Sequence, residues 1–301
     1  ASIIAFGAWA IGGWKWGGTD DQDSIRAIHA AHEQGINIID TAAVYGLGHS
    51  EKVVGQAIRD RRSDFIIATK CGLRWDGLPE GRGVYFFTDH EGNEIYRCLH
   101  PESIRQEVEA SLQRLGIDTI DLYQTHWQDQ TIPIEDTMES LVQLQEEGKI
   151  RTIGICNASL EQLKAYRAAG PLATDQENFS MLDQKLRGHH LTYIQEENLG
   201  FLAYSPLALG LLTGKVTPER EFPEDDLRSQ SERFSRENRK KVLDFLHQVQ
   251  PIADQYAVSL AQLVLVWTAQ VPGVSHLLAG IRNPEQATEN ARAGAVDLKA
   301  E

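Results

Sequence analysis

The sequence predicts one domain over residues 1–301, a TIM-type (β/α)₈ barrel. Two observations support this fold class. Short β-rich runs alternate with longer amphipathic stretches, and parallel strands need such helical crossovers between them. Eight strand candidates also fit the usual length of a closed barrel better than an open doubly wound sheet, which stays the alternative architecture.

Four strand–helix units are predicted in the first half of the chain. Their helices carry apolar residues on one face, as Ile25 and Ile28 show, and the first helix ends at Gly35. The strands are expected at residues 2–8, 36–40, 65–70 and 119–126, and the helices at residues 21–34, 50–59, 101–115 and 133–148.

The second half supplies the other four strands and one of two long excursions. Residues 74–98, after the third barrel strand, and residues 208–236, after the seventh, are too long for simple βα turns. Such excursions usually shape a binding site, and the alternative is that they are mobile ornaments. Strands are expected at residues 150–155, 172–176, 200–204 and 274–280, with helices at residues 159–169 and from Pro284 onward.

Charge and composition exclude several function classes. The chain has 29 basic and 43 acidic residues and a formal net charge of −14, which argues against a nucleic-acid-binding or anionic-membrane surface. One local phosphate site stays compatible with this balance. No apolar run is long enough to span a membrane.

Cysteine usage favours a reducing compartment. Cys71, Cys98 and Cys156 form no CxxC motif, and their odd number argues against a disulfide framework. We therefore expect a cytoplasmic protein without a secretory signal. Ala1 is not a start methionine, which suggests that a short N-terminal piece precedes it. No residue set predicts a metal site.

Three neighbouring strand ends carry chemically compatible residues, and barrel enzymes place their chemistry at the carboxyl ends of strands. Asp40 ends the second predicted strand and Tyr45 follows it, while Lys70 and His126 end the third and fourth. Taken singly, three of them have ordinary structural alternatives. Lys70 could lie at the barrel rim, Asp40 could cap a helix, and His126 could be a core residue with its hydrogen bonds satisfied. Together the four residue types indicate an active site.

These four residues suit proton transfer to an oxygen. We expect the Lys70 ammonium to lower the pKa of Tyr45, and Asp40 to keep that ammonium charged and oriented. Tyr45 would donate a proton to a developing alkoxide, and His126 a hydrogen bond to the same oxygen. A hydride from a nicotinamide supplies the missing reagent. The alternative is a Schiff-base lyase with Lys70 as nucleophile.

With these residues in view, the sequence resembles the aldo-keto reductase superfamily. The resemblance runs in order over nearly the whole chain. It implies a (β/α)₈ barrel, the reduction of aldehydes or ketones, and the tetrad Asp40, Tyr45, Lys70 and His126. The segments that carry it are NIIDTAAVYGLGHSE (37–51), IIATKCG (66–72), YQTHWQD (123–129), TIGICN (152–157), FLAYSPLALGLLTGK (201–215) and AGIRNPEQATEN (279–290).

The resemblance also implies NADP(H) as the cofactor. Asn157 and Gln176 would hold the nicotinamide carboxamide, and Tyr204 would stack on the ring. Arg282 would meet the 2′-phosphate and so favour NADP(H) over NAD(H), unless it is a solvated loop charge. The other implied cofactor-binding residues are Trp9, Asp40, Cys156, Ser205, Leu207, Leu209, Gly210, Lys215, Gly280, Ile281, Gln286 and Asn290.

The sequence departs from the family pattern at two positions near this site. Cys156 stands where serine is common, which weakens one contact to the carboxamide. Ala8 stands where threonine is common and lacks its hydroxyl. Neither change affects the proton donor.

The substrate is expected to be a small carbonyl compound, alcohol or sugar. Trp16, Trp75 and Trp127 would wall its pocket, with residues 74–98 as a lid, although some of these tryptophans are expected to be ordinary packing. The acidic residues of the lid favour neutral or polyhydroxy substrates over carboxylates.

An alternative function is a regulatory subunit. Some relatives bind NADP as redox sensors attached to ion channels, with little turnover. For either function we expect a monomer or a weak homo-oligomer.

Overall fold

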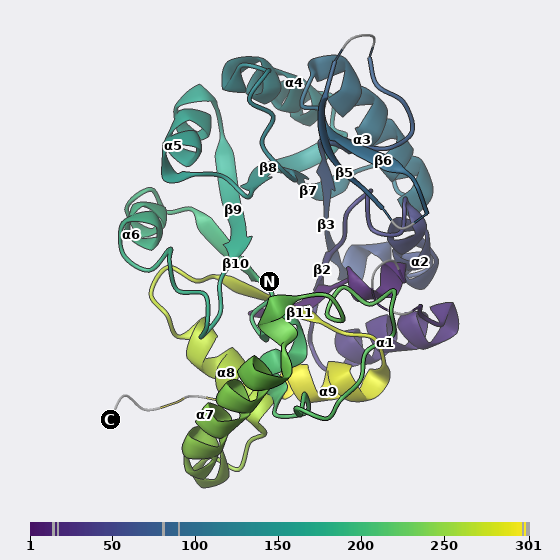
Figure 1. Cartoon of the computed structure of the whole chain (residues 1–301). Coiled ribbons are helices and arrows are strands. Elements are labelled where there is room, and N and C mark those ends of the chain that lie inside the picture. Colours follow the sequence, from purple (N-terminus) through teal and green to yellow (C-terminus); the bar gives the residue numbers. More distant parts are fainter. Residues whose placement is uncertain (14–15, 17, 80–81, 90, 297, 299–301) are drawn as a thin grey trace.

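Eight parallel strands close into a barrel that helices surround (Figure 1). The computed structural model describes the chain except residues 14–15, 17, 80–81, 90, 297 and 299–301. Each barrel strand pairs with the next one along the chain, and the last pairs with the first, which confirms the closed barrel and rules out the open sheet. The strands are β1 (Ile4–Gly7), β2 (Ile38–Asp40), β3 (Ile66–Cys71), β7 (Ile120–Thr125), β8 (Ile150–Cys156), β9 (Leu172–Asn178), β10 (Gly200–Tyr204) and β11 (His276–Gly280).

The helices begin and end where local sequence provides caps. The Asp20 side chain accepts a hydrogen bond from the Asp23 N–H at 2.8 Å, and Gly116 ends its helix with a left-handed φ of 65°. The helices are α1 (Asp21–Glu33), α2 (His49–Ile58), α3 (Pro101–Leu115), α4 (Ile134–Glu146), α5 (Leu160–Ala169), α6 (His189–Glu196), α7 (Arg236–Gln255), α8 (Leu260–Ala269) and α9 (Pro284–Ala293), with 3₁₀ helices η1 (Ala10–Gly12), η2 (Arg62–Asp64), η3 (Ala208–Thr213) and η4 (Glu232–Phe234).

Three of these helices, α6, α7 and α8, lie outside the helices that the sequence predicts. For α8 the reason is burial on nearly every side, as its run Leu263–Val266 shows. A helix buried all round has no polar face, so its sequence lacks the 3.6-residue periodicity that marks an amphipathic helix.

The barrel interior is filled by side chains. Ala5, Ile38, Ala68, Leu122 and Leu278 pack against one another inside it, and a larger apolar layer lies between the strands and the helices. Because the interior is packed, a ligand site has room only at an end of the barrel.

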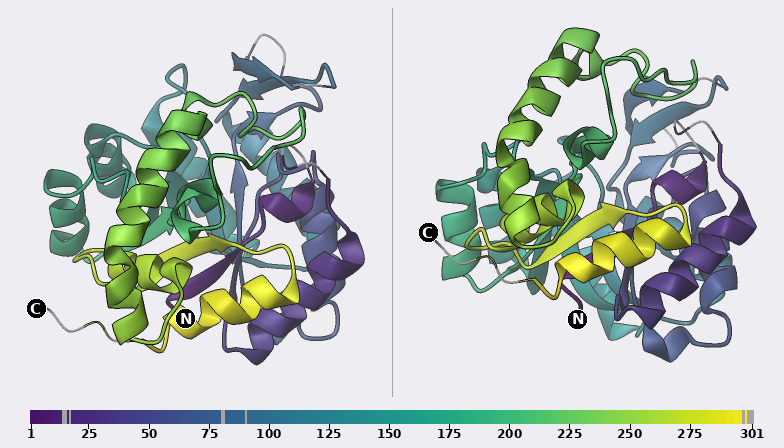
Figure 2. Two further views of the ribbon diagram at one scale, coloured as in Figure 1. Left: turned by 60° about the horizontal axis from the view of Figure 1, so that its bottom comes forward. Right: turned by 90° about the horizontal axis from the view of Figure 1, so that it is seen from below.

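The two excursions have different structures. The first contains a small antiparallel sheet of β4 (Leu73–Arg74), β5 (Val84–Thr88) and β6 (Glu94–Arg97), in the order β4-β6-β5. The second contains η3 and η4 and is otherwise irregular. Both views of Figure 2 place the β5–β6 hairpin (blue) and residues 208–236 (green) at the same end of the barrel.

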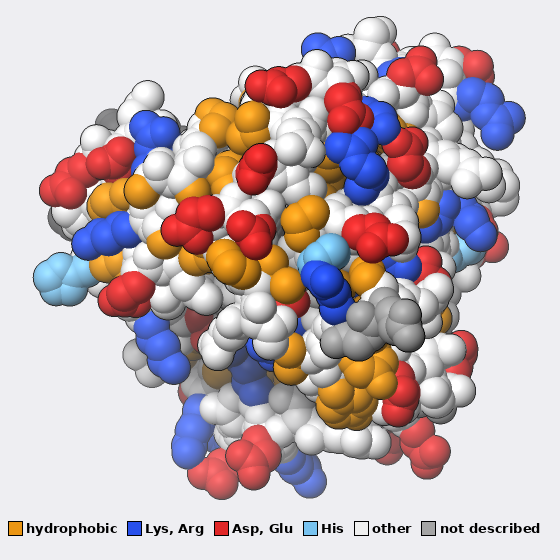
Figure 3. Space-filling view, turned by 90° about the horizontal axis from the view of Figure 1, so that it is seen from above, with side chains coloured by type: hydrophobic (Ala, Val, Ile, Leu, Met, Phe, Trp, Pro, Cys, Tyr) orange, Lys and Arg blue, Asp and Glu red, His pale blue; other side chains and the backbone are white. Residues whose placement is uncertain are grey.

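The exterior carries charges of both signs. Figure 3 shows acidic and basic side chains interspersed over one face, where the described residues form no continuous basic area. Within the described part of the chain, no helix combines the length and the apolar character needed to cross a bilayer.

Candidate active site

A cavity of about 600 Å³ opens at the carboxyl ends of the barrel strands. Strand ends, the β5–β6 hairpin, residues 208–236 and α9 all line it, so neither excursion is a mere ornament. The predicted site residues that line the cavity are Trp9, Trp16, Asp40, Tyr45, His126, Trp127, Asn157, Gln176, Tyr204, Ser205, Leu207, Leu209, Gly210, Lys215, Gly280, Arg282, Gln286 and Asn290.

Four predicted site residues do not line this cavity. Lys70 is buried directly beneath it against Asp40. The Cys156 thiol is buried, and burial raises the pKa of this thiol well above its ordinary value. Ile281 packs in the apolar layer between barrel and helices. Cys156 and Ile281 therefore do not line the cavity, and their contacts with a cofactor stay predictions.

Trp75, which is predicted to wall the substrate pocket, does not line the main cavity. It lies beside a separate cavity of about 30 Å³, with the Arg114 guanidinium 6.0 Å from its ring centre. Trp75 packs against the apolar cluster that contains Leu73, but of these two residues only Leu73 lines the main cavity. Phe86 and Phe87 of the hairpin supply the aromatic wall instead, together with Trp16 and Trp127.

A buried ion pair lies under the cavity floor. Lys70 Nζ donates to Asp40 Oδ2 at 2.7 Å and to the Thr41 carbonyl at 2.8 Å, and both charged side chains are almost wholly buried. Burial lowers the pKa of Lys70, but Asp40 and Tyr45 raise it above its ordinary value. Lys70 therefore stays an ammonium, as predicted, because its two oxygen partners replace the water it has lost.

Tyr45 lies between this ion pair and the cavity. Lys70 Nζ is 5.1 Å from the centre of the Tyr45 ring, and the His126 ring meets that ring edge-on at 5.7 Å. Burial raises the pKa of Tyr45 to about 12, because it outweighs the lowering by Lys70. The expectation of a phenol more acidic than usual is wrong for the protein without ligand. At neutral pH the hydroxyl keeps its proton, which is the form a proton donor needs.

His126 is neutral in this environment. Burial and the Lys70 charge hold the pKa of His126 well below its ordinary value. A neutral imidazole carries one N–H and one acceptor nitrogen, so it can donate a single hydrogen bond into the cavity.

Two side-chain amides line the cavity next to the tetrad. Asn157 has a left-handed φ of 53°; its Nδ2 donates to the His126 carbonyl at 2.8 Å and its Oδ1 accepts from the Tyr204 hydroxyl at 2.9 Å. Gln176 Nε2 donates to Asp40 Oδ1 at 2.8 Å. These contacts hold both amides and the Tyr204 ring in place at the cavity wall.

Four cations line the other part of the cavity, which we call the cationic end: Lys215, Arg220, Arg228 and Arg282. The Arg228 guanidinium binds both carboxylate oxygens of Asp226, at 2.9 and 2.6 Å. It also lies over the rings of Trp16 and Phe222, at 5.0 and 4.5 Å from their centres. Sequence reasoning missed Arg220 and Arg228, and the charge-rich composition of residues 208–236 was the available signal.

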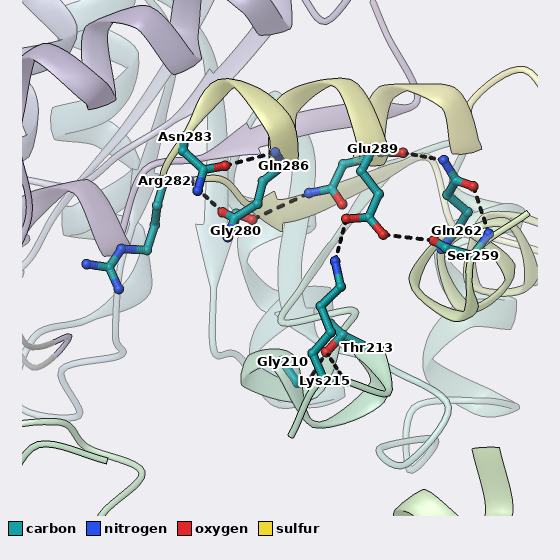
Figure 4. A network of polar contacts seen from close by, with 11 residues as sticks. Gly210, Thr213, Lys215, Ser259, Gln262, Gly280, Arg282, Asn283, Gln286 and Glu289 are labelled. Atoms are coloured by element: carbon teal, nitrogen blue, oxygen red, sulfur yellow. Dashed lines mark hydrogen bonds and ion pairs between the residues drawn. The ribbon is translucent and has the colours of Figure 1, made fainter. Parts of the chain in front are cut away.

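Figure 4 shows how this end is connected to α8 and α9. Lys215 Nζ donates to Glu289 Oε2 at 2.8 Å, and Glu289 Oε1 accepts from the Ser259 hydroxyl at 2.9 Å. The Arg282 side chain points away from this network, and its guanidinium donates to the Gly18 carbonyl. Gln286 Oε1 accepts from the Arg282 N–H at 2.9 Å.

The donor set fits a dinucleotide. Amides and an aromatic ring lie at one end of the cavity and cations at the other, whereas the chain as a whole has a net charge of −14. Gly280 lines the cavity between them, and a Cβ there would meet no protein atom within 4 Å. A nicotinamide, a pyrophosphate and an adenosine phosphate have matching chemistry along such a path.

The substrate preference expected from the acidic residues of segment 74–98, among them Asp76 and Asp89, can be compared with their contacts. Asp76 accepts from Arg74 Nε at 2.8 Å, and Asp89 accepts from the backbone N–H groups of Glu91 and Asn93. Neither aspartate lines the cavity, so the preference for polyhydroxy substrates inferred from them is unsupported. The described residues contain no cluster of three or more His, Cys, Asp or Glu side chains placed to hold a metal ion.

Comparison with known proteins identifies close relatives. The model of the aldo/keto reductase family matches residues 3–301. The chain is 40% identical over 289 residues to the aldo-keto reductase YhdN of Bacillus subtilis, covering 95% of this chain and 83% of the relative. It is also 40% identical over 303 residues to the NADH-specific methylglyoxal reductase of Escherichia coli, covering 99% and 91%.

A third relative is named as a channel subunit and not as an enzyme. The chain is 31% identical over 306 residues to a probable voltage-gated potassium channel subunit beta of Arabidopsis thaliana, covering 97% of this chain and 87% of the relative.

Solved structures agree with the sequence relatives. A glycerol dehydrogenase of Gluconobacter oxydans superposes with a TM-score of 0.87 at 38% identity, covering 99% of this chain and 88% of that one. An aldo-keto reductase of Klebsiella pneumoniae in complex with NADPH superposes with a TM-score of 0.72 at 27% identity, covering 99% and 87%.

Proposed function

The chain belongs to the aldo/keto reductase family, and from that premise we propose that it reduces aldehyde or ketone carbonyls with NADPH, with Tyr45 as proton donor. The observation that carries the proposal is the placement of Tyr45 above the Lys70–Asp40 ion pair, at the wall of a cavity of about 600 Å³. A Schiff-base lyase is disfavoured, because Lys70 is charged, buried and held by two oxygens.

The residues of the tetrad have separate tasks in this reaction. When bound, the nicotinamide supplies a hydride to the carbonyl carbon. Tyr45 gives its proton to the carbonyl oxygen, and the phenolate that forms lies beside the Lys70 ammonium, which stabilises it. The neutral His126 donates a hydrogen bond to the same oxygen as charge builds up on it. Asp40 keeps Lys70 in place.

The proposed preference for NADPH rests on the cationic end. Arg282 lies next to α9, whose N-terminal amides also favour a phosphate, and Arg228 and Lys215 add positive charge along the cavity. A relative is named as NADH-specific, so similarity alone does not decide this point. Separate titrations of the protein with NADPH and NADH, followed by quenching of tryptophan fluorescence, test the preference.

The proposed substrate is a small carbonyl compound or the matching alcohol. Leu73, Phe86, Phe87 and Trp127 form an apolar wall beside Tyr45 and His126. A panel of aldehydes, ketones and sugars, followed by NADPH absorbance, tests this function. Absence of turnover with every carbonyl class, in protein that binds NADPH, would contradict it.

Similarity to a potassium channel subunit favours one second candidate, an NADP-binding regulatory subunit. Slow single-turnover oxidation of bound NADPH, with no faster multiple-turnover reaction for any substrate in the panel, would favour it. A cytoplasmic location and a monomeric or weakly associating state stay predictions, which fractionation and light scattering can check.

A further inference from the structure

A buried group of titratable residues lies behind the cavity wall, outside the residues discussed so far. Asp175 and Glu177 are two residues apart on β9, so their side chains leave the same face of the strand, opposite to Gln176. Both are buried between the barrel and its helices. The reaction proposed above makes no use of either carboxyl group.

The two carboxyl groups have only partial sets of partners. Asp175 Oδ2 contacts His190 Nε2 of α6 at 2.6 Å, while its Oδ1 is buried and, among the described residues, has no hydrogen-bond donor. Each of these two carboxyl groups affects the pKa of the other, as expected for neighbours on one face of a strand. A protonated Glu177 would donate to Asp175 Oδ1 and so satisfy this acceptor.

Glu177 also holds the turn that carries Asn157. Its Oε1 accepts a hydrogen bond from the Ala158 N–H at 2.6 Å, while the Asn157 N–H donates to the Gln176 carbonyl at 3.2 Å. Asn157 itself has a left-handed φ of 53°, a conformation that asparagine adopts more often than most residues with a Cβ and that neighbouring contacts can hold. The Glu177 side chain thus helps to fix the turn whose amide contacts both His126 and Tyr204.

We propose that Glu177 is a positioning residue: as a protonated carboxyl group shared with Asp175, it locks the Asn157 turn and thereby the nicotinamide-facing wall of the cavity. This inference rests on the proposed cofactor site. In this proposal a series of contacts connects α6 to the active site: His190 contacts Asp175, Asp175 shares a proton with Glu177, and Glu177 holds the turn whose Asn157 amide binds the His126 carbonyl.

The charges around Glu177 are consistent with the protonated form. Burial and the Asp175 carboxylate raise the pKa of Glu177 to about 9. The other titratable groups near the pair are His190 of α6, which contacts Asp175, and Cys156 of β8 and Tyr204 of β10, whose pKa values Glu177 raises. Only His190 can carry a positive charge, and it is already paired with Asp175.

The test compares Glu177→Gln with Glu177→Ala. A glutamine amide donates and accepts like a protonated carboxyl group, so Glu177→Gln should keep the NADPH dissociation constant within about twofold. Glu177→Ala loses both hydrogen bonds and should weaken NADPH binding by about tenfold, with a smaller change in kcat. Tryptophan fluorescence gives the dissociation constants, and steady-state kinetics gives kcat.

A pH series separates a shared proton from a merely structural role. In the unchanged protein the NADPH dissociation constant should rise between about pH 7 and 10, as Glu177 loses its proton beside Asp175. In Glu177→Gln this rise should be absent. Because the glutamine variant keeps the packing, the comparison stands even if Glu177→Ala does not fold.

Asp121→Ala is a matched control. Asp121 is a partly buried carboxylate that also accepts a backbone hydrogen bond, from the Ile67 N–H at 2.8 Å, but at the other end of the barrel strands. It should lower the melting temperature without changing NADPH binding.

A double variant tests whether Glu177 acts through Asn157. In an Asn157→Ala background, Glu177→Ala should add little further loss of NADPH affinity, because the locked amide is already gone. Equal binding by Glu177→Ala and the unchanged protein would overturn the inference, as would equal damage from Gln and Ala. Failure of the unchanged protein to bind NADPH would instead overturn the proposed function.

Discussion

The two ends of the cavity are built in different ways. At the catalytic end, Lys70 and Asp40 belong to barrel strands, and their side chains are 0% and 4% exposed. At the cationic end, Lys215 and Arg228 come from the irregular segment 208–236, and the Lys215 side chain is 64% exposed. Proton transfer needs groups held within a fraction of an ångström, which packed strands provide. Attraction of phosphates acts over a longer range, so cations from loops are sufficient, whether exposed as Lys215 or held by an ion pair as Arg228.

This difference indicates which property a substitution should change at each end of the cavity. Substitutions at the catalytic end should alter chemistry or stability, whereas substitutions at the cationic end should alter the choice and release of cofactor. One sequence relative is named as NADH-specific, whereas a solved relative binds NADPH, which is consistent with that division.

The largest difference between an effect on kcat and an effect on cofactor binding is expected for Tyr45→Phe. Removal of the proton donor should lower kcat by about 10³-fold, because general acid catalysis contributes factors of this size. NADPH binding should stay within about twofold, since the ring and its contacts remain. Steady-state kinetics and a fluorescence titration measure the two effects. Near-normal kcat in this variant would show that the proton comes from another group.

Lys70→Met should affect stability as well as activity. It leaves Asp40 buried without its cation, which should cost about 3–5 kcal/mol in the free energy of unfolding, measured by urea denaturation. The double variant Asp40→Asn/Lys70→Met should recover much of that loss but none of the activity. If the single variant were as stable as the unchanged protein, the ion pair would not be the anchor of the catalytic end.

Arg282→Ala probes the cationic end. Loss of a guanidinium from the 2′-phosphate should raise the NADPH dissociation constant by about 10- to 100-fold and leave NADH binding nearly unchanged. Parallel fluorescence titrations with both cofactors measure this. Arg26→Ala, on the exposed face of α1, is the control and should change neither value. Equal losses for NADPH and NADH would place Arg282 elsewhere than at the 2′-phosphate.

Lys215→Ala should have a smaller effect. In its ion pair with the partly buried Glu289, the Lys215 side chain is 64% exposed, and ion pairs screened by water contribute little to stability. We expect no resolvable change in melting temperature and a faster release of NADPH, by less than about fivefold. Stopped-flow fluorescence measures the release rate. A large loss of stability would mean that this pair holds segment 208–236 on the barrel.

The smallest change is expected in the pH profile of the reduction. Tyr45 donates its proton from the protonated form, which is present below its pKa of about 12, and His126 stays neutral because its pKa is far below its ordinary value. Neither group changes state between about pH 6 and 9, so kcat for reduction should vary less than about twofold there. A steep loss of kcat within this range would show that one of the two pKa directions is wrong.

Much of the catalytic end could be predicted from the sequence. Asp40, Tyr45, Lys70 and His126 each lie at or just after a strand end, and the barrel topology brings neighbouring strand ends together. The local periodicity of apolar residues predicts the alternation of strands and helices. The fold class and the tetrad therefore follow from the order of residues along the chain.

The rest depended on contacts between segments far apart in the sequence. Arg228 and Phe86 reach the cavity, and Trp75 lies beside a separate one, because of the paths that the two excursions take. The pKa of Tyr45 rises because burial outweighs a nearby charge, and burial exists only in the folded chain. By itself the sequence determined which residues meet at the strand ends, since that follows from local patterns. Only the tertiary structure decided how deeply each is buried and which neighbours it has, since these depend on all the surrounding segments at once.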